Sequence, residues 1–303
     1  MLDGIIRIER LMEHLKEQGM NSCAITDHGN LFGAVEFYRL AKEAGIKPIL
    51  GCEVYVTFDK DDLKNKDKER KNCHLTLLAQ NKAGWQNLLW MVTQSYLHNF
   101  YYKPRVCFGH LESRSEGIIA LTGCLAGLVS RLGHYNEKEV TFTDPEGTAY
   151  AMLQGLKQIY GDKLYAEIQD NAMWEQGIYN KWLLEKAKGL GIPPVITTDA
   201  HYLKHTDHEM HKMVLAQQMK KTMDEYMKGD ELRYGSGYFI RSTDEMFDAA
   251  VRHGAEEAFW NTQKIADLCE LELALGEYQN PMFDITSCDD YKDYLRWKSE
   301  RAQ

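Results

Sequence analysis

The sequence lacks the features of a membrane or secreted protein. It has no run of about eighteen apolar residues, so we expect no membrane-spanning helix and no membrane partner. Its first residues lack the basic and then apolar pattern of a signal peptide. Its seven cysteines include no C-x-x-C pair, and an odd, scattered set is typical of reduced cysteines. We therefore expect a cytoplasmic protein.

The sequence also lacks an excess of basic residues. Its formal net charge is -9, whereas a self-sufficient nucleic-acid-binding protein usually carries a basic face. Any contact with DNA is therefore expected to come through a partner or through sequence outside this chain. Acidic residues and histidines can instead concentrate cations.

Short apolar runs alternate with amphipathic helical patterns over the first two thirds of the chain. This alternation predicts a parallel sheet, either open or closed into a barrel. The predicted strands are 22–26, 48–56, 74–79, 118–122, 164–169 and 194–198, and the predicted helices are 5–18, 31–44, 82–98, 124–132, 146–160 and 174–190. Gly45 stands where a helix C-cap is expected. The charged stretch 59–71 is interpreted as a solvated loop.

The strand signal nearly disappears after residue 204. A methionine-rich helical stretch leads to one apparent strand at 238–241, and more helix follows. We expect a metal-binding barrel over residues 1–204 and a mainly helical extension over 205–303.

Side chains that can bind metals gather at the predicted strand ends. In βα barrels the carboxyl ends of the strands form the active face. Imidazole, carboxylate and thiolate groups on one rim suit zinc, manganese or iron. The residues concerned are Asp27, His28, Glu53, His74, Cys124, Glu167, Asp199 and His201.

Each of these residues alone also has a structural interpretation. A single histidine near a strand end is usually a hydrogen-bonded structural residue, and a lone cysteine usually belongs to the core. Asp27 could cap the following helix. His205, His208 and His211 follow at helical spacing, and a solvated helix face explains them better than metal binding. The combination of ligand types at successive strand ends is what favours a metal site.

Six ordered motifs resemble the polymerase and histidinol phosphatase family, in the form of its replicative polymerase branch. The resemblance covers essentially residues 1–285. The motifs are Ala24–Tyr38, Gly51–Tyr55, His74–Ala79, Tyr101–Arg105, Thr122–Gly127 and Thr198–Tyr202. The Asn-Leu-Phe-Gly and Tyr-Lys-Pro-Arg elements favour the polymerase branch over free-standing phosphatases.

The resemblance implies a fold and a ligand set. The family fold is a distorted, TIM-like (β/α)7 barrel that holds two or three divalent metal ions, zinc, manganese or iron. The ligands implied here are Asp3, His28, Glu53, His74, Cys124, Asp199 and His201, with Glu167 and Asp27 as weaker candidates. The family begins with a strand that ends in His-x-His, and this sequence starts at Met1-Leu2-Asp3-Gly4, after that strand. We therefore expect a barrel without its first strand.

The resemblance also implies a function. The chain would be the N-terminal module of a replicative DNA polymerase, with DNA reached through the rest of the enzyme and with other replisome subunits as partners. Its own chemistry would be metal-dependent hydrolysis of a phosphodiester, as in 3′–5′ exonuclease proofreading, or of pyrophosphate. Two alternatives are an inactive docking scaffold for a proofreading subunit and a phosphatase of the histidinol phosphate type. No polymerase active site is expected here, since Asp289-Asp290 is only an acidic pair in a polar stretch.

Overall fold

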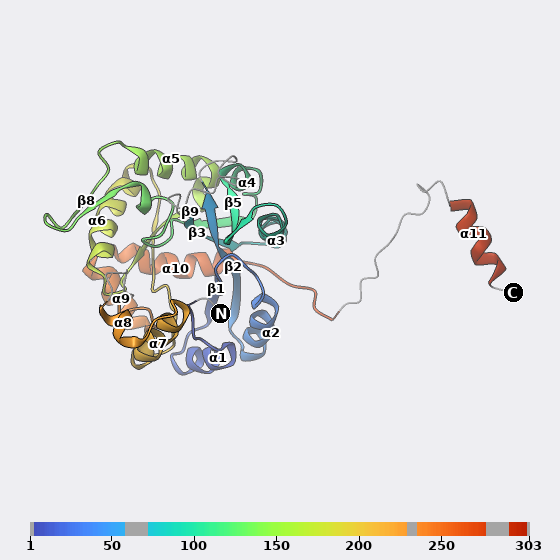
Figure 1. The fold of residues 1–303 in the computed structure, drawn as a ribbon, viewed down its shortest axis with the longest axis horizontal. Coiled ribbons are helices and arrows are strands. Elements are labelled where there is room, and N and C mark those ends of the chain that lie inside the picture. Colours follow the sequence, from blue (N-terminus) through green and yellow to red (C-terminus); the bar gives the residue numbers. More distant parts are fainter. Residues whose placement is uncertain (1–2, 58–71, 229–234, 277–290, 302–303) are drawn as a thin grey trace. The chain divides into compact units, whose positions relative to one another are not determined.

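A curled, mixed sheet of eight strands forms the centre of the protein, with helices around it (Figure 1). The computed structural model describes residues 3–57, 72–228, 235–276 and 291–301. The sheet has the order β10-β9-β6-β3-β2-β5-β4, and β1 also pairs with β2. The strands are β1 (Ser22–Ile25), β2 (Lys47–Thr57), β3 (Cys73–Ala79), β4 (Phe100–Tyr101), β5 (Lys103–Cys107), β6 (Ile118–Leu121), β9 (Leu164–Gln169) and β10 (Pro194–Thr197). This half-barrel is consistent with the predicted distorted TIM-like fold. A separate hairpin joins β7 (His134–Asn136) to β8 (Thr141–Thr143).

The long strand β2 organises one half of the sheet. Its first residues pair with β1 in parallel, for example Ile49 with Ala24, and its last residues pair with β5, for example Tyr55 with Arg105. An isolated parallel bridge extends the β1 side to His28 and Glu53. Strand β3 pairs along the opposite edge of β2. Glu53 is thus held between two neighbouring segments of backbone.

The expectation of an all-parallel sheet was wrong at β3. This strand runs antiparallel to both β2 and β6. Consecutive parallel strands need a crossover of a dozen or more residues, usually a helix, and the charged stretch between β2 and β3 carries no helical pattern. As a consequence, β3 begins at the same edge of the sheet where β1 ends. A residue at the start of β3 therefore lies near the residues that follow β1.

Most of the predicted helices are confirmed. They are α1 (Ile8–Glu17), α2 (Ala34–Ala44), α3 (Lys82–Leu97), α5 (Thr148–Tyr160) and α6 (Trp174–Gly189), while α4 (Phe108–Ser113) was not predicted. Gly45 ends α2 in the left-handed conformation, with φ of 74°.

The helix predicted over 124–132 was wrong, because the structure has only a 3-10 turn, η2, at Ser130–Leu132. The Ser130 hydroxyl lies within hydrogen-bond distance of the main-chain carbonyls of Leu125, Cys124 and Gly127, of which the Leu125 carbonyl is the nearest acceptor at 2.8 Å. A side chain that bonds nearby backbone in this way competes with helix formation.

Between the last strand and residue 271, the described residues contain four further α-helices, namely α7 (His208–Gln218), α8 (Met223–Lys228), α9 (Thr243–Arg252) and α10 (Glu256–Leu268). They belong to the same compact unit as the sheet, Met1–Leu271. Ile265 of α10 packs with Ile49, Leu121 and Val195 of the sheet in one buried cluster. Full burial of such a side chain contributes about 1.5–3 kcal/mol. The strand predicted at 238–241 was wrong, since only one isolated bridge forms, between Tyr202 and Phe239.

Residues 272–303 form a second unit, which contains α11 (Tyr291–Glu300). The charged stretch 59–71 and the Asp289-Asp290 pair lie outside the described residues. The boundary predicted at residue 204 remains a prediction about how a longer protein is divided. No helix in the described part of the chain is long and apolar enough to cross a membrane.

Candidate metal centre

The centre is built on the main-chain pairing of β2 with the segment after β1. The Glu53 amide donates to the carbonyl of Asp27 at 3.1 Å, and the Gly29 amide donates to the carbonyl of Glu53 at 2.9 Å. Gly29 has a φ of 63°, and a Cβ there would lie 2.7 Å from the Pro104 ring. Glycine is therefore required for the sharp turn that follows His28.

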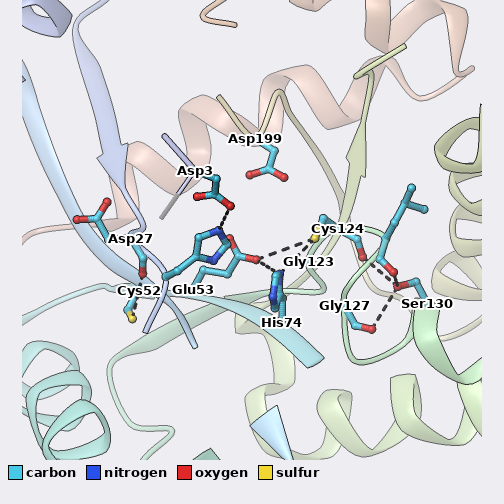
Figure 2. Close-up of polar contacts among 12 residues, drawn as sticks. Asp3, Asp27, Cys52, Glu53, His74, Gly123, Cys124, Gly127, Ser130 and Asp199 are labelled. Carbon is cyan, nitrogen blue, oxygen red and sulfur yellow. Dashed lines mark hydrogen bonds and ion pairs between the residues drawn. The ribbon is translucent and has the colours of Figure 1, made fainter. Parts of the chain in front are cut away.

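Glu53 lies at the middle of the site and is only 7% exposed (Figure 2). One carboxylate oxygen pairs with Nδ1 of His74, and the other lies 3.5 Å from Nδ1 of His28. The Cys124 sulfur lies 3.6 Å from Nδ1 of His74 and 4.0 Å from the Glu53 carboxylate. Carboxylate, imidazole and thiol thus meet from β2, β3 and the loop after β6.

Asp3 completes a second group on the other side of His28. Its Oδ2 atom lies 3.3 Å from Nε2 of His28 and 3.8 Å from Nε2 of His201. The main chain holds this N-terminal segment in place, because the Ile5 amide donates to the His201 carbonyl at 2.8 Å. The first and the last of the predicted ligands are therefore neighbours.

The orientation of His201 is fixed by its own backbone. Its Nδ1 donates to the main-chain carbonyl of Asp199 at 2.6 Å, which leaves Nε2 facing Asp3. Asp199 has a φ of 51°, a left-handed conformation that a non-glycine residue adopts only when its surroundings impose it. A second ring nitrogen that is hydrogen-bonded in this way is the usual arrangement of a metal-binding histidine. The Asp199 carboxylate lies 4.0 Å from the same imidazole.

The electrostatics of the site follow from burial and from carboxylate–imidazole pairing. Burial raises the pKa of Asp3, but the hydrogen bonds from His201 and His28 prevail and hold this pKa well below its usual range. Burial lowers the pKa values of His28 and His201, but pairing with Asp3 and nearby carboxylates raises each to about 9. For Asp199, burial is the main cause of a raised pKa. Without a cation, protons on the imidazoles balance the buried carboxylates, and a divalent cation could replace them.

Two groups of side chains could each hold a metal ion, with ligand atoms within 4.8 Å of one another. The groups are Asp3, His28 and His201, and His28, Glu53 and His74. Nitrogen, oxygen and sulfur donors of this kind fit zinc, manganese or iron. Nδ1 of His28 is buried and makes no hydrogen bond, as expected for a ligand atom. Because a neutral imidazole offers one lone pair, His28 can serve one ion at a time.

Asp27 does not join the cluster. Figure 2 shows its carboxylate turned away from Glu53 and His74. Its contribution is made by its main chain, whose carbonyl accepts from the Glu53 amide and from the Cys52 thiol at 3.4 Å. The helix-cap alternative also finds no support, because Gly33 is the N-cap of α2 and no side chain caps it.

Glu167 is buried beside the centre with protein donors on both oxygens. One oxygen accepts from the Gly123 amide at 3.1 Å, and the other accepts from the Thr197 hydroxyl at 2.6 Å and from the Gln169 amide at 3.2 Å. Burial raises its pKa to about 7. These contacts connect the ends of β6, β9 and β10, and so they anchor the loop that carries Cys124.

Two residues at the centre were missed from the sequence. The Tyr55 ring stacks on His28 with ring centroids 5.9 Å apart, and its edge contacts His74 at 5.2 Å. Strand alternation could have found it, because Tyr55 is two residues after Glu53 and shares its face.

His211 was expected on a solvated helix face, but it is fully buried, with its ring centroid 5.6 Å from that of His201. That expectation was wrong for His211.

Comparison with known proteins shows the family to which the chain belongs. Residues 1–171 match the PHP domain, so the chain belongs to the PHP domain family. It is 36% identical over 98% of its length to the DNA polymerase III subunit alpha of Aquifex aeolicus, 35% identical over 98% to that of Thermus aquaticus, and 36% identical over 98% to that of Deinococcus radiodurans. The chain spans only 26%, 24% and 22% of those relatives' lengths, respectively. It thus carries a PHP module related to that of replicative polymerase alpha subunits.

Proposed function

We propose that the chain is the PHP module of a replicative DNA polymerase and that its metal centre hydrolyses the phosphodiester at the 3′ end of a DNA strand. The observation that carries the proposal is the convergence of two ligand groups on His28 at one rim of the sheet. Acting in a cytoplasmic polymerase, the module would reach DNA and other replisome subunits through the rest of that enzyme.

The residues divide into two ligand groups. Asp3 and His201 would hold one cation, Glu53 and His74 a second, and His28 would serve either. Cys124 and Asp199 lie at the edge of these groups and would extend them. Bound divalent cations would supply positive charge that stabilises a phosphoester's transition state and makes water a better nucleophile. The protein's own contribution is to fix the imidazoles, as Asp199 does for His201 through its carbonyl.

An aromatic surface beside the centre favours a nucleic-acid strand over a small phosphoester. Phe32, Tyr96 and Phe100 are exposed. The Tyr96 ring lies between the other two, with its centroid 6.2 Å from that of Phe32 and 5.9 Å from that of Phe100. The side chain of Asn30 links this surface to the site, because it donates to the His28 carbonyl and accepts from the Phe32 amide. Unpaired bases stack on such rings, typically with about 1–3 kcal/mol per base.

The aromatic surface makes a separate prediction. Phe32→Ala and Phe100→Ala should raise KM for a single-stranded oligonucleotide about 5- to 160-fold, the range that corresponds to about 1–3 kcal/mol of stacking. Hydrolysis of bis(p-nitrophenyl) phosphate should be unchanged, because this substrate is too small to reach both rings. Steady-state kinetics with the two substrates measure this. Equal effects on both substrates would show that the rings act through the fold.

Metal analysis combined with hydrolysis tests the main proposal. The purified chain should contain zinc, manganese or iron, or take them up on incubation, and release nucleotides from a 3′ end. His201→Ala and Glu53→Gln should lower metal content and abolish hydrolysis, because each removes one ligand of a group. Asp27→Asn is the matched control, since this carboxylate points away from the cluster, and it should keep both properties.

Two results would redirect the proposal. A wild-type chain that takes up none of the three metals would exclude the metal centre. A chain that binds metal but hydrolyses neither a 3′ phosphodiester nor pyrophosphate would favour the alternative function, a docking scaffold for a separate proofreading subunit.

A further inference from the structure

We propose that His211 is a positioning residue that fixes Asp3 and His201 in the geometry needed for metal binding. The inference rests on the proposed metal centre and assigns it a supporting side chain from outside the sheet. His211 belongs to α7, which comes after the last predicted ligand along the chain.

His211 lies on the buried face of its helix, together with Leu215 and Ala216. The neighbouring Met210 and Met213 are each 58% exposed, whereas His211 is 0% exposed. A histidine is costly to bury unless its polar atoms find partners, and an apolar side chain would fill the same space at lower cost. The presence of an imidazole here therefore calls for a polar role.

The contacts of His211 converge on the Asp3–His201 pair. Its ring centroid lies 5.6 Å from that of His201 and 5.2 Å from that of Tyr202. The main-chain carbonyl of Asp3 is a polar neighbour of the His211 ring. An imidazole N–H can donate to that carbonyl, which Leu or Phe in its place cannot do.

A main-chain hydrogen bond also joins the segment that contains Asp3 to the segment that contains His201. The Ile5 amide donates to the His201 carbonyl at 2.8 Å and so sets the spacing of the two backbones. The His211 ring packs against the His201 ring from α7, with the two ring planes at 59°. The Asp3 carboxylate and Nε2 of His201 lie 3.8 Å apart. Partners of this kind, which touch a ligand but not the metal, typically change metal affinity about 10- to 100-fold when they are removed.

The test compares variants at position 211 in the whole chain. His211→Leu keeps the volume and removes the donor, whereas His211→Asn and His211→Gln restore an amide N–H near Nδ1 or Nε2. His208→Leu is the matched control, because His208 lies on the same helix and its Nδ1 is 3.3 Å from the Tyr202 hydroxyl. Each protein is titrated with Mn²⁺ and with Zn²⁺ against a competing chelator, and its metal-free thermal unfolding is recorded.

We expect His211→Leu to weaken binding of one metal equivalent about 10- to 100-fold. At least one amide variant should recover most of this loss, and His208→Leu should bind like the wild type. Unchanged binding by His211→Leu overturns the inference. So does a loss that neither amide restores and that follows the fall in the metal-free unfolding midpoint, because His211 would then be a packing residue. Absence of metal binding by the wild type would instead overturn the proposed metal centre.

Discussion

Glu167 shows how a carboxylate can lie at a metal centre and serve the fold. Both of its oxygens accept hydrogen bonds from protein groups, including the Gly123 amide. We predict that Glu167→Gln lowers the free energy of unfolding of the metal-free chain by about 1–3 kcal/mol, because the new amide group would face the buried Gly123 N–H. The number of metal ions bound should stay the same. Urea denaturation and elemental analysis measure the two quantities, and loss of a metal equivalent would make Glu167 a ligand.

One carboxylate that links the helix α9 to the sheet is Asp170, directly after β9. Asp170 lies 2.6 Å from Arg252 and 3.9 Å from His253 at the end of α9, and 3.6 Å from Arg241 before it. Burial raises the pKa of Asp170. The hydrogen bond from Arg252 and the charge of Arg241 together lower this pKa by more than burial raises it, so the net shift is downward. A depressed carboxylate pKa stabilises the fold above the unfolded value, about 3.9, and this stabilisation is lost as pH falls through the folded value.

We therefore predict that Asp170→Asn destabilises the chain at neutral pH and that the difference from wild type shrinks as pH falls below the unfolded carboxyl value, about 3.9. Urea unfolding of both proteins across this range measures it. His253 has a pKa lowered mainly by burial, so its protonation adds an acid-dependent loss from about pH 6.5 downward. His253→Asn removes that second contribution and serves as the control. A constant difference between wild type and Asp170→Asn at all pH values would contradict the prediction.

The sequence predicted elements well where the signal was local. Gly45 marked the end of α2, and the strands that precede His28 and Asp199 or contain Glu53 were recognised from their apolar runs. Strand β5 was missed because Pro104, which reads as a turn residue, lies within it. His211 was misjudged because its burial depends on Asp3 and Tyr202, and contact with Asp3 across about 200 residues leaves no mark on local periodicity.

At the scale of the whole molecule, the candidate metal centre belongs to one compact unit, Met1–Leu271. Near the end of this unit, the Glu270 amide donates a hydrogen bond to the Gln80 carbonyl, directly after β3, at 2.7 Å. We predict that a chain ending at Gly276 keeps the unfolding midpoint and metal content of the full chain, because it retains all of this unit. Calorimetry and elemental analysis compare the two proteins. A drop of more than a few degrees would show that residues after 276 support the fold.

The pairing of Asp3 with His201 joins segments that lie about 200 residues apart, and it has a consequence for biosynthesis. Asp3 is synthesised well before His201. A nascent chain that has not reached His201, or a degraded chain that has lost either segment, therefore cannot assemble this ligand group. Metal uptake by this group would then wait until both chain segments have been synthesised, and it would report the integrity of both at once. A bound metal ion would link the two segments, and local unfolding of either segment would release the ion before the sheet itself unfolded.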